Sequence, residues 1–106
     1  MAVYVDPAIW PWRDRLWCHL RADEPDELFA FAAKLGLPRA WLQTTPRRPW
    51  KDHYDLPEPM RFQAVALGAI EIDVAGAAEL TRRLKARHRG EVSAEDAPAR
   101  FPIGQD

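Results

Sequence analysis

The chain opens with a short run of β-prone residues that is followed by a proline-rich stretch. Residues 3–5 predict a strand that stops at Asp6 and Pro7. Asp6 has two interpretations of equal weight: it lies at the ligand-binding edge of an α/β sheet, or it merely begins the turn with Pro7. Residues 9–12 are interrupted by Pro11, so we expect an irregular segment that covers one end of the core.

A second strand is predicted where apolar residues alternate with others over residues 15–21. Leu16, Cys18 and Leu20 would share one face, and His19 would point to the other. We interpret Cys18 as a small buried hydrophobic residue rather than as a reactive thiol. For His19, a packed, hydrogen-bonded ring and a ligand or base are equally compatible with the sequence.

Three later segments have the apolar spacing of helices. The first, residues 23–36, begins with acidic residues and a proline and ends at a glycine. The second starts at residues 57–59 and stops at Gly68. The third is capped by Asp73 and reaches Gly90. Its basic end complements the helix dipole, which favours a solvated face over a phosphate-binding patch.

Two further short strands complete the predicted fold. Residues 37–43 would follow the first helix as the last part of a right-handed, parallel βαβ unit, and residues 69–72 would form a final strand. The sequence therefore predicts an α/β fold, a small sandwich of about four short, mostly parallel strands covered by three helices. Residues 1–90 would form this single domain, and residues 91–106 would form a loose C-terminal tail.

Composition narrows the classes of protein. The 106 residues are 47% hydrophobic and 29% charged, which is ordinary for one soluble domain. The net charge of −1 argues against a protein that binds nucleic acid over its whole surface. A single cysteine, the lack of a signal-like start and the lack of a long apolar run indicate a cytoplasmic protein that does not enter a membrane. Exposure of Trp10 or Trp12 would favour a homodimer.

The proline-bounded segment 46–57 is the first candidate for a functional site. We expect it to be a connection, neither a full helix nor a long strand, and it carries His53, Tyr54 and Asp55 in succession. If folding gathers the right partners around it, the chain has enough ligands for one divalent metal ion, Zn²⁺ or Mn²⁺, with a position left for water. The predicted metal ligands are Asp6, His19, His53, Asp55 and Glu71. Such an ion would suit hydrolysis of a phosphoester, a nucleotide or an amide.

Three alternatives stay open beside the metal-dependent hydrolase. In a metal-free enzyme, His53 would act as general base, oriented by Asp55 or Glu71, while Arg61 would bind an anionic group and Tyr54 would donate to it. In a non-catalytic module, a basic and aromatic surface would bind a small phosphorylated ligand, a nucleotide or nucleic acid. That surface would consist of Arg47, Arg48, Trp50 and Lys51. In a purely structural protein, the polar cluster would only satisfy buried backbone.

Several short motifs together resemble a family of small bacterial and phage proteins catalogued as domain of unknown function 4031. The residues that carry the resemblance are Tyr4-Val5-Asp6, Pro11-Trp12, Cys18-His19, Ala22-Asp23, Glu27-Leu28, Trp41, Gln43, His53-Tyr54-Asp55, Arg61, Ala66-Leu67-Gly68-Ala69 and Glu71. The resemblance covers about residues 1–85, and the chain departs from the pattern by inserting residues 44–51 before His53. It implies an independently folding bacterial or phage module and brings no activity with it.

Overall fold

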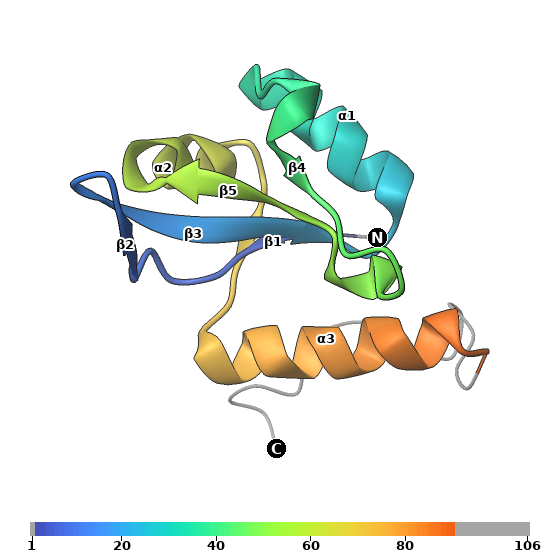
Figure 1. The fold of residues 1–106 in the computed structure, drawn as a ribbon. Helices are drawn as coiled ribbons and strands as arrows, with labels where there is room; N and C mark the ends of the chain where they lie inside the picture. The colour runs from blue at the N-terminus through green and yellow to red at the C-terminus, as the bar shows by residue number, and fades with distance from the viewer. Residues whose placement is uncertain (1, 91–106) are drawn as a thin grey trace.

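A computed structural model describes residues 2–90, which form one mixed β-sheet with helices on both faces (Figure 1). The strands are β1 (Val3–Val5), β2 (Trp10–Trp12), β3 (Arg15–Ala22), β4 (Leu42–Gln43), β5 (His53–Pro57) and β6 (Ile70–Glu71). The helices are α1 (Pro25–Leu35), α2 (Glu58–Ala66) and α3 (Val74–His88), with short 3₁₀ turns η1 (Arg39–Trp41) and η2 (Pro49–Lys51).

The sheet has the order β4-β5-β3-β1-β6, and β2 pairs with β3 as a hairpin. Only β1 and β6 pair in parallel; the other pairings are antiparallel. The α/β class is confirmed, but the prediction of about four mostly parallel strands is wrong. The predicted parallel pairing of the strands on either side of α1 is also wrong: β3 and β4 run in the same direction, but β5 lies between them and pairs antiparallel with both.

Two segments that the sequence analysis read as irregular are strands. Residues 10–12 pair with β3 despite Pro11, which lies in a strand with one unpaired edge, where its missing N–H is tolerated. Residues 53–57, expected to belong to a connection, form β5 in the interior of the sheet. Their alternation of half-buried His53 and Asp55 with buried Tyr54 and Leu56 is the period of a strand with one covered face.

Helices pack on both faces of the sheet. On one face, α1 and α2 bury the larger core, as Figure 1 shows. Its fully buried side chains include Val5, Cys18, Leu20, Leu56 and Ala64. On the other face, α3 packs Leu80 and Leu84 against Tyr4 and Ile72. Alternate residues of β3 and β5 therefore point either into the larger core or towards the side of α3.

The helix boundaries follow the capping signals in the sequence, so the three predicted helices are confirmed. Before α1, Glu24 and Glu27 form a capping box, and Gly36 ends the helix with φ of 76°. Before α3, the Asp73 side chain accepts a hydrogen bond of 2.7 Å from the backbone N–H of Gly76.

Arginines tie α3 to the sheet and to the start of α1. Arg83 donates to Asp23 over 2.8 Å, and both side chains are about nine-tenths buried. Arg87 pairs with Glu24. From the sheet, Arg21 donates to Oγ1 of Thr81 over 2.8 Å. The basic end of α3 thus contains internal ion pairs, in addition to the solvated face that the sequence favoured.

Two predictions concern the limits of the chain. Residues 91–106, predicted to be a loose tail, lie outside the described residues. Within residues 2–90, no helix has the length and apolar character that crossing a membrane requires.

Candidate functional site

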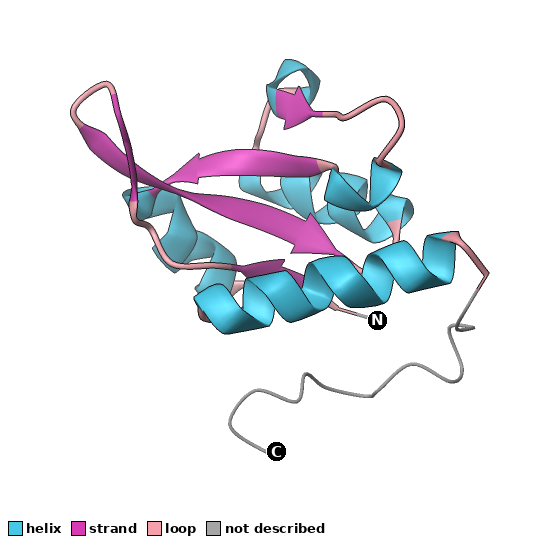
Figure 2. Cartoon of the chain, turned by 60° about the horizontal axis from the view of Figure 1, so that its bottom comes forward, coloured by secondary structure: helices cyan, strands magenta, loops and turns pink. Residues whose placement is uncertain are grey.

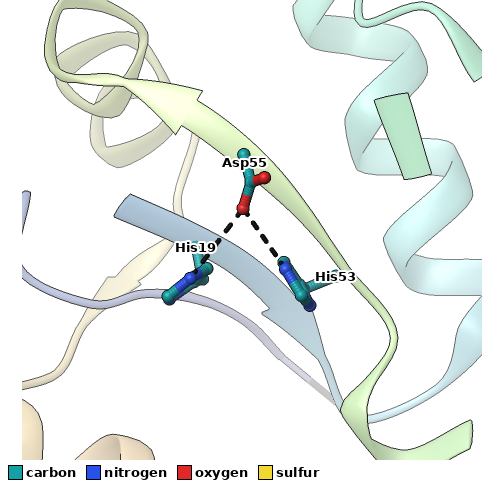
Figure 3. Close-up of side chains that lie close together, drawn as sticks. All are labelled: His19, His53 and Asp55. Atoms are coloured by element: carbon teal, nitrogen blue, oxygen red, sulfur yellow. Dashed lines mark ion pairs between the residues drawn. The ribbon is translucent and has the colours of Figure 1, made fainter. Parts of the chain in front are cut away.

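The site is built on neighbouring strands whose polar side chains share one face of the sheet. On β3, Cys18 and Leu20 point into the larger core, so His19 points the other way. Asp55 on β5 lies directly opposite His19, and His53 lies two residues before it on the same face. Figure 3 shows the three side chains converging above the paired strands.

The three side chains bring their donor atoms to one small volume. His53 Nε2 lies 3.2 Å from Asp55 Oδ1, and His19 Nε2 lies 3.8 Å from the same oxygen. One ligand atom from each residue lies within 4.8 Å of the others. The side chains of His19, His53 and Asp55 remain 30%, 26% and 42% exposed, so water reaches the cluster.

Asp6 fixes the orientation of His19. Its Oδ2 lies 2.7 Å from His19 Nδ1, and its Oδ1 accepts a hydrogen bond of 2.6 Å from the His19 backbone N–H. An ionised carboxylate only accepts, so His19 carries a proton on Nδ1. In the neutral ring, Nε2 is then an unprotonated acceptor that faces Asp55.

The His53 ring is fixed in the same tautomer by a backbone carbonyl. Its Nδ1 lies 2.8 Å from the carbonyl oxygen of Lys51, which can only accept a hydrogen bond. The proton of neutral His53 therefore sits on Nδ1, and Nε2 presents its lone pair to Asp55. In their neutral forms, both imidazoles thus turn their N–H groups away from the cluster and their unprotonated nitrogens into it.

The hydrogen bond that His19 donates to Asp6 is the main reason that the pKa of His19 lies above its usual value. Burial acts in the opposite direction, and the charges of Asp6 and Asp55 raise the pKa further. The site therefore favours a positive charge at His19, whether a proton or another cation supplies it.

Asp6 and Glu71, two other predicted ligands, lie outside the three-residue cluster. Both Asp6 oxygens bind His19, so Asp6 orients a ligand instead of facing the same volume. Glu71 pairs with Arg61 at 2.9 Å. Arg61 also donates to the Asp6 backbone carbonyl over 2.8 Å, which commits its guanidinium to the protein instead of to a bound anion.

Tyr54 cannot act beside His53 as the sequence analysis proposed. Successive residues of a strand point to opposite faces, so Tyr54 enters the larger core and is only 1% exposed. Its neighbours His53 and Asp55 point to the other face. The three consecutive residues His53, Tyr54 and Asp55 therefore do not share one face of the sheet.

The predicted basic and aromatic surface before β5 is only partly displayed. Arg47, Arg48 and Lys51 are exposed. The Trp50 ring, however, packs beside the ring of His88 on α3, at 5.1 Å between centroids, and its carbonyl accepts from Arg21. Cations are available there, but the indole is already half covered by the protein.

A hollow of about 460 Å³ lies between the start of α1, η2 and the end of α3, and neither His19 nor His53 lines it. Its charged lining is largely engaged, since Asp23 pairs with Arg83 and Glu24 pairs with Arg87. We assign the chemistry to the cluster of His19, His53 and Asp55, because within residues 2–90 no other His, Cys, Asp or Glu side chains bring three possible metal-ligand atoms so close together.

Sequence reasoning missed two contributors to the site. The Lys51 carbonyl fixes His53, and a backbone contact of this kind has no sequence signal. Trp10 lies beside His19, with the ring centroids 5.6 Å apart. The alternation of Trp10 and Trp12 was a signal for a strand with both rings on one face, which the intervening proline obscured.

Residues 3–87 match the family described as protein of unknown function (DUF4031), and the chain belongs to that family. No curated protein and no solved structure matched the chain. The family description assigns no activity, so the function has to be argued from the site.

Proposed function

We propose that His19, His53 and Asp55 bind one divalent metal ion, Zn²⁺ or Mn²⁺, and that the protein is a metal-dependent hydrolase acting on a phosphoester or nucleotide. The observation that supports this proposal most directly is the convergence of three acceptor atoms within 4.8 Å, with both imidazole N–H groups directed elsewhere. Two bare imidazole nitrogens and a carboxylate oxygen repel one another unless a cation lies between them.

The spacing of the donor atoms suits a metal ion. Tetrahedral ligands at about 2.0–2.2 Å from zinc are about 3.3–3.6 Å apart. The contacts of His53 and His19 with Asp55 Oδ1, 3.2 and 3.8 Å, bracket that spacing closely enough for small side-chain rotations to complete the set. Three protein ligands and solvent access are the arrangement in which catalytic zinc keeps an open position for water.

The surroundings of the ligands also fit a metal site. A metal-bound histidine usually donates its other ring N–H to a carboxylate or a backbone carbonyl. His19 has such a partner in Asp6, and His53 has one in the Lys51 carbonyl. Both partners are supplied by the fold itself, so the ring orientations precede any binding event.

The charge of the loaded site supports an anionic substrate. A divalent ion with two neutral imidazoles and one carboxylate carries a net charge of about +1, which attracts a phosphate group and stabilises the charge that develops during hydrolysis. Such an ion would lower the pKa of bound water towards 7. Hydroxide would then attack phosphorus, the bond to the leaving oxygen would break, and that oxygen would take a proton from water.

Metal binding is tested first, without a substrate. Elemental analysis of protein purified without chelators should give about one metal ion per chain. Calorimetric titration of the metal-free protein with Zn²⁺ or Mn²⁺ should give the same stoichiometry. Replacing His53 with alanine should abolish binding. The third histidine, His88, lies on α3 and contacts Trp50, so His88→Ala is the matched control and should bind normally. Iron also accepts two histidines and a carboxylate, and elemental analysis distinguishes it.

Hydrolysis is tested separately on the loaded protein. We expect release of nitrophenol from bis(p-nitrophenyl) phosphate that is lost with EDTA and in His53→Ala. Stoichiometric metal binding without turnover of phosphodiester, phosphomonoester or nucleotide substrates would instead favour the non-catalytic nucleotide or nucleic-acid module. Absence of metal binding would contradict the proposal itself.

One observation favours a second mechanism, in which His19 acts as a metal-free general base. Asp6 orients its Nδ1–H, as a carboxylate does in catalytic dyads, and the side chain is 30% exposed. His53, the base expected from the sequence, fits less well, because a backbone carbonyl instead of a carboxylate holds its Nδ1, and its Nε2 lies nearer to Asp55, at 3.2 Å against 3.8 Å for His19. Activity that survives EDTA and is lost in His19→Gln would identify this mechanism.

A further inference from the structure

The β2–β3 hairpin extends the face of the sheet that carries the candidate metal site. Trp10 pairs with Trp17, and Trp12 pairs with Arg15. Residues directly opposite one another in antiparallel strands share a face, and so do residues two apart along a strand. These four side chains therefore lie on the same face as His19, and Figure 2 shows the hairpin reaching out from the rest of the sheet.

We infer that this hairpin is a binding surface for single-stranded nucleic acid, with its bases stacked on Trp10 and Trp12 and its backbone directed to the metal site. The inference rests on the proposed function and specifies its substrate class. The Trp10 and Trp12 side chains are about half exposed, at 49% and 58%, so their rings are accessible to a ligand.

The aromatic surface is fixed before any ligand arrives. The Trp17 Nε1–H donates to the Trp12 carbonyl over 2.8 Å, and the two rings meet edge to face with centroids 5.4 Å apart. The hairpin turns through Arg13 and Asp14, both with positive φ, which matches the twist of a two-residue turn. A rigid platform loses little side-chain entropy on binding, so stacking contributes more of its energy to affinity.

Charge on the hairpin favours a nucleic acid. Arg15 is exposed on the same face as Trp12 and lies opposite it. Arg13 lies over the Trp12 ring, with its guanidinium carbon 4.6 Å from the centroid. Aromatic rings beside arginines are the combination with which proteins hold single strands, since bases stack and phosphates pair with the cations. Asp14 at the tip offsets one of these charges, so we expect a modest affinity with a small salt dependence.

The position of the surface connects it to the reaction. Trp10 lies against His19, so a base stacked there leaves the adjacent phosphate beside the candidate metal. Trp10 and Trp12 are two residues apart, about 7 Å along the strand, which accommodates successive bases and favours a strand over a single nucleotide. Pro11 between them lacks an N–H, which disfavours extension of the sheet by a peptide or a second copy of the chain at this edge.

The test measures binding of a fluorescein-labelled eight-residue oligothymidylate to the full chain in EDTA and low salt, by fluorescence anisotropy. Trp12→Ala and Trp10→Ala should each weaken binding at least five-fold. Trp12→Phe, which keeps an aromatic ring, should lose less. Trp41, 39% exposed on η1 away from the hairpin, provides the matched control, and Trp41→Ala should bind as the wild type does. Circular dichroism checks that each variant is folded.

Charge and ligand length are tested in the same assay. Arg15→Ala should reduce the slope of log affinity against log salt by about one, while Arg82→Ala, an exposed arginine on α3, should leave it unchanged. Free thymidine monophosphate should compete more than ten-fold less well than the oligomer. If the mononucleotide competed as well as the oligomer, the ligand would be a mononucleotide instead of a single strand, and the inference would be wrong.

The outcomes separate this inference from the metal proposal. Because the assay contains EDTA, binding that needs the tryptophans supports the hairpin surface even if no metal binds. Stoichiometric metal binding without oligonucleotide affinity at low salt overturns the hairpin surface alone. Concentration-dependent dimerisation that is lost in Trp12→Ala, with no affinity for oligonucleotide, overturns it in favour of contact between two copies of the chain.

Discussion

The Asp6 carboxylate binds His19 twice, through the backbone N–H at 2.6 Å and through Nδ1 at 2.7 Å. A residue that directly follows β1 thus sets both the backbone and the ring of a residue in β3. Through this pair, the turn after β1 controls the direction of the lone pair on His19 Nε2.

Removing the Asp6 charge should weaken metal binding without removing a ligand. In Asp6→Asn the amide no longer stabilises the positively charged, metal-bound ring, and we expect Zn²⁺ affinity to fall about 10- to 100-fold, measured by competition with a chelator. Asp26→Asn, an exposed acid in α1, is the control and should keep the wild-type affinity. Unchanged affinity in Asp6→Asn would show that the carboxylate does not support a metal ligand.

The metal-free protein should lose stability as pH rises through the pKa of His19. This pKa is raised in the folded protein from the usual value of 6.5, so the stabilising contribution is complete below about 6.5 and disappears above the folded pKa. Urea unfolding in EDTA between pH 5 and 8 measures the slope. His19→Gln should flatten it. Metal-loaded protein should show the reverse trend, since protons compete for Nε2.

Cys18 should be almost inert in the folded protein. Burial raises the pKa of its thiol to about 12, and the side chain is fully inaccessible. At pH 8, iodoacetamide should react only on global unfolding, so the rate should increase with urea; the chain has one cysteine, so mass spectrometry reads the site directly. Above about pH 9 this contribution to stability should decline, because the unfolded thiol ionises first. Fast alkylation in native buffer would contradict the packing of β3.

The ion pair between Asp23 and Arg83 should matter more than the ion pair between Glu79 and Arg82. The Asp23 side chain is about nine-tenths buried, and it also accepts hydrogen bonds from the Tyr4 hydroxyl and the Ala2 backbone N–H. Asp23→Ala leaves a buried guanidinium without its carboxylate and should cost about 3–5 kcal/mol in the free energy of unfolding. Glu79→Ala breaks a solvent-exposed pair within α3 and should cost at most about 1 kcal/mol. Chemical denaturation measures both.

Tyr54→Phe should retain metal affinity. Tyr54 lies between the two ligands of β5 in sequence but on the opposite face of the strand, in the core under α1 and α2. Calorimetry should therefore give the wild-type dissociation constant for Zn²⁺. A loss of more than ten-fold in a folded Tyr54→Phe protein would show that the hydroxyl reaches the site.

Local signals predicted the helices, and the sheet depended on contacts that local signals do not encode. Caps such as Asp73 and stops such as Gly36 act within one turn of the chain, so they are visible in the sequence. Strand order depends on pairing between distant residues, as between His19 and Asp55. A short strand that follows a proline-rich turn, ends at Pro57 and leads directly into α2 carries little propensity of its own, which is why the sequence predicts a connection there.

The sequence predicted which residues gather near the candidate site, but it did not predict which of them face the shared volume and which orient a neighbour. The sequence indicated His19, His53 and Asp55 among five ligands, and the structure brings these three together. The other two predicted ligands have different partners. The Asp6 carboxylate accepts a hydrogen bond from His19, and the Glu71 carboxylate accepts one from Arg61. Whether the cluster holds a metal stays a prediction until the ion is measured.

The arrangement of β5 makes assembly of the site inseparable from folding. A slip of one residue against β3 would expel Tyr54 and Leu56 into water and bury two polar ligands in their place. A compact chain with this shifted register would lack the site, and the loss of apolar burial alone would make it less stable than the native register. An ion captured by the aligned form would oppose denaturation of the entire chain, by about 2.7 kcal/mol at a hundred times its dissociation constant.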